Sequence, residues 1–197
     1  MNSASTLISR IVNSLARAAG DKAEILNQDK SIKRRMNLKK LVIISGSARI
    51  RAEPGDPIPA IQRYDGVFER LLRKYYPDLV GLDILILSPT TGLVFAEDKI
   101  GLQEPIKGSW HEFLLTKKDI LRLKQNNMRF LRDLFTRRKY EEIYVNVGKE
   151  LLKMIEGIEV LVPTSTKVTY AQGKGIGPKM SHMKEWLKPY IRQRKIQ

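Results

Sequence analysis

Hydroxyl side chains, glycines and a cation gather where short apolar runs of this sequence end. They are Ser45, Gly46, Ser47 and Arg49 after the run 41–44, and Ser88 and Gly92 after the run 82–87. A third polar stretch, 163–167, follows the run 158–162. Exposed backbone N–H groups, hydroxyls and a guanidinium can together bind a phosphate, a ribose or a base edge. Each stretch alone is also typical of an ordinary turn, but their coincidence favours a nucleotide-binding pocket.

These loops need a parallel sheet to bring them together. The apolar runs predict strands, and segments of helical period predict the helices between them. The strands are expected at 41–44, 82–87, 143–147 and 158–162, and the helices at 65–76, 116–135, 149–155 and 179–194. This alternation predicts an α/β fold, a mainly parallel sheet of at least four strands with helices on both faces. In such folds ligands bind beyond the carboxyl ends of the strands, where the loops would meet.

The first part of the chain has a different character. Apolar residues at 7, 8, 11, 12 and 15 follow the period of an amphipathic helix, and a polar, basic stretch comes after them. We therefore expect residues 1–38 to form an N-terminal helix and basic linker, and residues 39–197 to form the α/β domain. No apolar run approaches the roughly 20 residues of a membrane-spanning helix, so we expect a cytoplasmic protein without a membrane partner.

A glycine-rich loop precedes the last predicted helix. Its glycines are Gly173, Gly175 and Gly177. The spacing fits neither a Walker loop nor a dinucleotide fingerprint, because the required residues and a following strand are missing. The loop either binds a phosphate at the helix N-terminus or lets the helix pack closely. Trp110 is a similar case, because a loop tryptophan either stacks on a base or packs against the rim of the core.

The residue types exclude several kinds of chemistry. The chain has no cysteine and two histidines. A thiol nucleophile and a Cys-ligated metal are therefore excluded, and we expect no metal and no cofactor. No single side chain stands out as catalytic.

Positive charge is the strongest feature of the composition. There are 36 Lys and Arg against 21 Asp and Glu, a net charge of +15. Such an excess attracts polyanions, and nucleic acid is favoured over a merely solvated surface because acidic residues are so few. The residues that we predict to contact phosphates are Lys33, Arg34, Arg35, Arg137, Arg138, Lys139, Lys174 and Lys179. A basic run at 192–195 belongs to the same pattern.

Three stretches together resemble a known family. They are Ile44-Ser45-Gly46-Ser47-Ala48-Arg49, the segment 87–94 (Leu-Ser-Pro-Thr-Thr-Gly-Leu-Val), and the segment 104–110 (Glu-Pro-Ile-Lys-Gly-Ser-Trp). They are similar to the core domain of archaeosine synthase, which acts in 7-deazaguanine modification of tRNA. Small α/β domains of unknown function and, more distantly, the bacterial peroxide-stress family are also similar. The resemblance covers about residues 40–190 and implies tRNA as the partner.

This sequence departs from that family at the residues of its chemistry. Gly46 stands where the family has a cysteine, and Ile50-Arg51-Ala52 stands where it has Lys-Pro-Tyr. The resemblance therefore implies a role in 7-deazaguanine tRNA modification without the standard lysine-transfer residues. The chain would be either a non-catalytic subunit beside a partner enzyme or a divergent base-modifying transferase. A flavin-dependent reductase with a flavodoxin-like fold is a further alternative, because such enzymes bind the flavin phosphate with a similar loop after the first strand.

Overall fold

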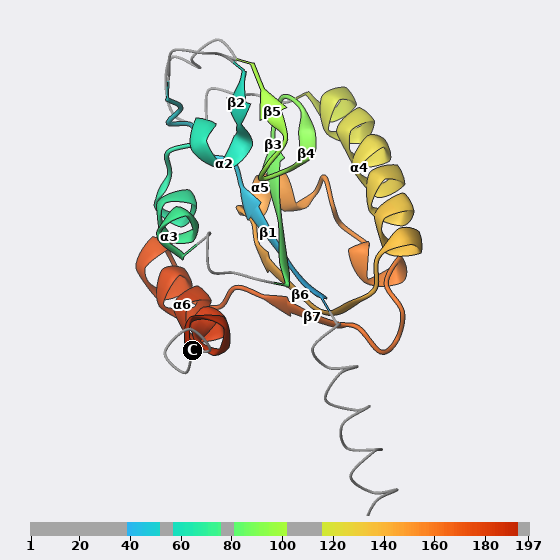
Figure 1. The fold of residues 1–197 in the computed structure, drawn as a ribbon. Helices are drawn as coiled ribbons and strands as arrows, with labels where there is room; N and C mark the ends of the chain where they lie inside the picture. Colours follow the sequence, from blue (N-terminus) through green and yellow to red (C-terminus); the bar gives the residue numbers. More distant parts are fainter. Residues whose placement is uncertain (1–38, 52–56, 76–80, 102–115, 193–197) are drawn as a thin grey trace, which may run out of the picture. The chain divides into compact units, whose positions relative to one another are not determined.

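A five-stranded sheet is built around β1 (Lys39–Ser45), its central strand. β3 (Leu82–Ser88) and β6 (Tyr140–Asn146) pair with β1 in parallel, and β7 (Lys167–Tyr170) pairs in parallel with β6. β4 (Gly92–Phe95) closes the other edge, antiparallel to β3 (Figure 1). Residues 41–44 of β1 are fully buried. A continuous apolar run of this kind is typical of a parallel strand covered on both faces.

The computed structural model describes residues 39–51, 57–75, 81–101 and 116–192. The predicted N-terminal helix and linker, with Lys33, Arg34 and Arg35, lie outside the described residues, and so does Trp110. The boundary that we expect at residue 38 therefore stays a prediction. In the part of the chain that is described, no helix is both long and apolar enough to cross a membrane.

One face of the sheet packs against α4 (Lys117–Arg137), α5 (Lys149–Leu152) and the short 3-10 helix η3 (Ile158–Val160). Leu41 and Ile43 point into this half of the core. Thr116 caps α4. Its side chain accepts a hydrogen bond from the Asp119 N–H (3.1 Å), and the Asp119 carboxylate accepts one from the Thr116 N–H (3.1 Å). This reciprocal pair satisfies two of the backbone donors that a helix start leaves free.

The opposite face packs against α2 (Ala60–Arg63), α3 (Val67–Tyr75) and α6 (Ile176–Arg192). The alternate residues of β1, Val42 and Ile44, point to this side. Figure 1 shows α4 on one side of the strands and α3 and α6 on the other. The predicted α/β sheet with helices on both faces is therefore confirmed.

The predicted fourth strand at 158–162 is wrong. Gly157 has a φ of +91° and is followed by η3, and Val160 is 87% exposed. Ile158 is fully buried, and Leu161 and Val162 are only partly buried against the core. The strand is β7, which was missed because it is a short edge strand with exposed ends and no continuous apolar run.

The polar stretch 163–167 consequently precedes a strand instead of following one. The Thr166 hydroxyl donates to the carbonyl of Tyr140, the first residue of β6 (2.8 Å). The stretch therefore lies at the amino ends of the parallel strands and cannot join the loops at their carboxyl ends.

Asn127 ties α4 to two other parts of the fold. Its side chain is buried (3% exposed), and its Oδ1 accepts a hydrogen bond from the backbone N–H of Leu93 (2.9 Å). Its Nδ2 donates to the carbonyl of Met154 (3.2 Å), between α5 and η3. Asn127 thereby fixes the helix against β4 and against the segment that follows β6.

Replacing Asn127 by alanine would leave the Leu93 N–H and the Met154 carbonyl buried without partners. We expect Asn127→Ala to lower the free energy of unfolding by about 2 to 3 kcal/mol. Asn126→Ala is the matched control, because Asn126 is exposed on the same helix and should change stability by less than about 0.5 kcal/mol. Urea denaturation followed by circular dichroism measures both, and equal losses would show that the two hydrogen bonds contribute nothing.

Candidate functional site

The loops after β1, β3 and β6 meet at the carboxyl edge of the sheet. The Gly46 N–H donates to the Leu87 carbonyl (2.8 Å), and the Ser45 hydroxyl accepts from the Gly148 N–H (2.7 Å). A Cβ on Gly46 would lie 3.1 Å from the Tyr64 ring, so the loop passes close over this ring. A glycine, which has no side chain, therefore fits this close approach at position 46.

Ser88 and Gly92, both predicted to bind a nucleotide, form the turn between β3 and β4. Ser88 is buried (1% exposed), and its hydroxyl is hydrogen-bonded to the Thr90 hydroxyl (2.8 Å) and accepts from the Thr90 N–H (3.2 Å). Gly92 has a φ of +79°, and a Cβ there would lie 2.4 Å from Asn127 Oδ1. Turn geometry and packing therefore explain both residues without a ligand.

Two buried polar side chains that the sequence analysis missed lie at this edge. One is Tyr64, which is 2% exposed. Among the described residues, no group lies at the distance and angle of a regular hydrogen bond to the Tyr64 hydroxyl. Burial raises the pKa of Tyr64, while the nearby hydroxyls of Ser88 and Thr91 partly oppose the shift.

The other is Glu69, in the first turn of α3 and 1% exposed. Burial raises the pKa of its carboxyl to about 7, although the backbone N–H groups of Glu69 and Ser47 and the charge of Arg73 act in the opposite direction. Its Oε1 has no hydrogen-bond partner among the described residues. A Cβ on Gly66 would lie 2.4 Å from Oε2 and 2.8 Å from Ser47 Cβ, so the carboxyl sits against the loop after β1. A buried carboxyl with a raised pKa and an oxygen without a protein partner is a candidate for a functional group.

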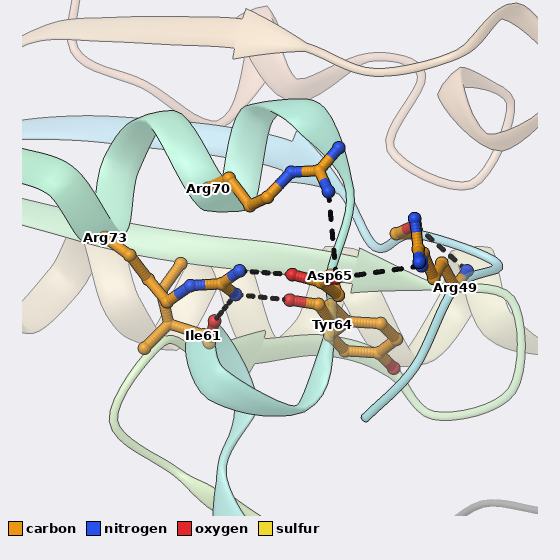
Figure 2. A network of polar contacts seen from close by, with 7 residues as sticks. Arg49, Ile61, Tyr64, Asp65, Arg70 and Arg73 are labelled. Carbon is orange, nitrogen blue, oxygen red and sulfur yellow. Dashed lines mark hydrogen bonds and ion pairs between the residues drawn. The ribbon is translucent and has the colours of Figure 1, made fainter. Parts of the chain in front are cut away.

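Three arginines surround the Asp65 carboxylate, next to Tyr64 (Figure 2). Arg73 binds it and also donates to the carbonyls of Ile61 and Tyr64 (2.7 Å each). The Arg49 and Arg70 guanidiniums lie 3.7 and 3.8 Å from the same carboxylate, with side chains 72% and 50% exposed. Three cations thus share one carboxylate, which leaves positive charge beside the loop after β1 for a bound anion.

The glycine-rich loop follows β7 at the same edge. Gly173 and Gly175 have φ values of +101° and +84°, and a Cβ on Gly173 would lie 2.4 Å from Pro178 Cβ. α6 begins at Ile176, so Gly177 already belongs to the helix. Gly173 is therefore required for packing against the first turn of α6. Next to it, Lys174 is exposed and Lys179 is half-buried.

The end of α4 lies at the opposite edge of the sheet. Arg138 donates to Asp83 Oδ2 (2.7 Å), near the start of β3, and its guanidinium lies 5.1 Å from the centre of the Phe95 ring. Arg137 and Lys139 are exposed beside it. The predicted phosphate-binding residues therefore do not form one cluster. Arg137, Arg138 and Lys139 lie at the amino edge of the sheet, whereas Lys174 and Lys179 lie at the carboxyl edge with the predicted nucleotide-binding residues.

No family model matches the sequence, and no curated protein matches it. Among solved structures, the crystal structure of AF0587, a protein of unknown function, is similar, with a TM-score of 0.42 and 15% sequence identity. The match covers 76% of this chain and 44% of that chain, so this protein spans less than half of its length. At these values the likeness carries no argument about function. The described residues contain no group of histidines and carboxylates that could hold a metal ion.

The buried carboxyl of Glu69 should make stability depend on pH. Its pKa is 4.5 when solvated and about 7 in the fold, so unfolding releases a proton between these values. The free energy of unfolding should therefore fall as pH rises through this window, by on the order of 3 kcal/mol. Glu69→Gln keeps the shape without the charge and should remove this dependence, as measured by urea denaturation from about pH 4.5 to 8.

Glu141→Gln is the control, because Glu141 is exposed on β6 and forms no ion pair among the described residues. Its free-energy difference from the wild type should stay constant over the same pH range. A Glu69→Gln variant that also differs from the wild type by a constant would show that Glu69 is not the buried titrating group.

Proposed function

We propose that this protein binds RNA through the phosphate backbone, which lies along the outer face of α4. The observation that carries the proposal is the charge of this helix, which has seven cationic and two acidic side chains. Lys118, Arg122, Arg129 and Arg132 are all exposed and recur at helical spacing, so they form a cationic stripe on one face of the helix.

The stripe has the dimensions of a backbone contact. At 1.5 Å per residue, the axial distance from Lys118 to Arg132 is about 21 Å, and about 28 Å to Arg137. Successive phosphates of a nucleic-acid strand advance by about 3.4 Å along the duplex axis. One face of α4 is therefore long enough for cations to reach several phosphates of the same strand.

Most of this charge has no role inside the fold. α4 buries Leu123, Asn127, Leu131 and Leu134, which lie on its other side. Within the described residues Arg129 and Arg132 form no ion pair, whereas Arg122 lies 3.9 Å from Asp119. Cations that repel one another and stabilise no internal contact are explained by an external polyanion.

The sequence resemblance suggests which RNA is bound and in which process. Likeness to the archaeosine synthase core favours tRNA and a role in or beside 7-deazaguanine modification. With Gly46 in place of the family's cysteine, the chain would bind tRNA for a partner enzyme, and the loop after β1 would face the base. The exposed guanidinium of Arg49 is available there for a phosphate.

A base-modifying transferase is the second candidate, and Glu69 is the observation that favours it. A carboxyl with a pKa of about 7 can give or take a proton near neutral pH. Its Oε1 has no hydrogen-bond partner among the described residues, and the Tyr64 ring lies against the same loop after β1. Mass analysis of nucleosides from tRNA incubated with the protein and a 7-deazaguanine donor tests this activity, and an unchanged profile removes it.

Neutralising the stripe should weaken RNA binding and its salt dependence. For the double variant Arg129→Gln, Arg132→Gln we expect the slope of log Kobs against log[salt] to become shallower by about 1 to 2, because about two fewer phosphate contacts release counterions. Fluorescence anisotropy with a labelled, unmodified tRNA transcript over a salt series measures the slope.

The control is the double variant Lys74→Gln, Lys188→Gln, which removes the same charge from α3 and α6 on the other face of the sheet. It should leave the slope within about 0.5 of the wild-type value. Equal effects of the two double variants would mean that only net charge matters, which would contradict the assignment of the binding face to α4.

A further inference from the structure

A cavity of about 230 Å³ lies beside the last turns of α4, away from the loops at the carboxyl edge of the sheet. Its lining combines three apolar and three charged side chains. They are Phe95, Phe130, Leu134, Asp133, Arg137 and Arg138. Phe95 comes from β4 and Arg138 follows the last residue of α4, so helix and sheet edge both contribute to the walls.

Two aromatic rings shape the apolar wall. The Phe95 and Phe130 rings have centroids 5.7 Å apart and are tilted by 58°. Both side chains are only partly buried, although they pack against the core. Arg138 covers the Phe95 ring and is itself held by Asp83 at 2.7 Å. Aromatic surface that stays accessible beside fixed cations is suited to stacking with a base.

The polar groups of the cavity fit the other parts of a nucleotide. The Asp133 carboxylate is exposed and has no hydrogen bond or ion pair among the described residues, so it can accept from an amino group of a base. Arg137 is likewise exposed and without an ion pair in the described structure, so it can bind a phosphate. A carboxylate would be out of place in a site for phosphates alone, because it repels them.

The cavity lies on the face of α4 next to the stripe, since consecutive helix residues are about 100° apart. Phe130 and Asp133 follow Arg129 and Arg132 directly in the sequence, so the cavity opens beside its carboxyl-terminal end. A strand whose phosphates lie along the stripe would bring its next base to the Phe130 ring.

We propose that this cavity binds one unstacked base that carries an exocyclic amino group, from an unpaired segment of the RNA held by α4. The inference rests on the proposed RNA binding and adds a preference for unpaired bases. Phe130 supplies the stacking surface, Asp133 accepts from the amino group, and Arg137 holds the adjoining phosphate. Cytosine and uracil can test the role of Asp133, because cytosine has an amino group at the position where uracil has a carbonyl oxygen.

The test compares three RNA probes at one salt concentration: an eight-nucleotide oligocytidine, an eight-nucleotide oligouridine, and a blunt duplex of mixed sequence. We expect the wild-type protein to bind oligocytidine several-fold more tightly than oligouridine. Phe130→Leu should weaken binding of both single strands by about ten-fold and leave the duplex unchanged, because only stacking is lost. Asp133→Asn should bring the ratio of the two single-strand affinities close to one.

Phe68→Leu is the matched control, because Phe68 is a partly buried phenylalanine of α3 on the opposite face of the sheet. It should bind all three probes as the wild type does, and unchanged duplex binding by Phe130→Leu shows that this variant is folded. Equal wild-type affinity for the two single strands, or a Phe130→Leu loss that extends equally to the duplex, overturns the proposal. RNA binding by α4 would still stand in either case, provided that Arg129→Gln, Arg132→Gln retains its effect on the salt slope.

Discussion

The parallel pairing of β1 with β3 and β6 is the constraint on which the rest of this structure depends. A strand that is hydrogen-bonded on both sides and buried on both faces must be covered by helices above and below the sheet. Parallel strands also place all their carboxyl ends at one edge. The close approach of Gly46 to Tyr64 and the burial of Glu69 follow from this arrangement, since both lie where the loop after β1 leaves the sheet.

The carboxylates at the two edges of the sheet differ in how fully they are paired. At the amino edge the carboxylates are paired: burial alone would raise the pKa of Asp83, but hydrogen bonds from Tyr140 and Arg138 and the charge of Lys39 lower it overall. Glu142 is similarly held by Thr169 (2.8 Å) and by the ammonium groups of Lys40 and Lys167 (3.4 Å each). At the carboxyl edge Glu69 keeps an oxygen without a partner. The paired carboxylates of β3 and β6 therefore stabilise the amino edge, whereas the carboxyl edge retains a buried carboxyl that could act on a ligand.

Periodicity predicted the fold well wherever burial was complete. The central strands are continuous apolar runs, and α4 has both a capping pair and an apolar stripe, so each could be assigned from local pattern. β7 was missed for the opposite reason, because an edge strand buries only part of its side chains and leaves no run to recognise. The apolar run at 158–162 led to a wrong strand prediction. In the sequence its exposed residues, such as Val160, cannot be distinguished from buried ones.

The candidate site was less accessible to sequence reasoning than the fold. Acidic residues in a first helical turn usually serve the helix dipole, and nothing in the sequence distinguishes Glu69 from that ordinary case. Adjacent basic residues drew attention to Arg137–Lys139, whereas the stripe of Lys118, Arg122, Arg129 and Arg132 is spread over four turns and becomes visible only on the helix surface. The sequence by itself determined the α/β pattern and the surplus of positive charge, because apolar periodicity and net charge are properties of the chain. Only the tertiary structure decided which carboxylates are buried and which cations stay exposed to solvent, because burial depends on residues that are distant in the sequence.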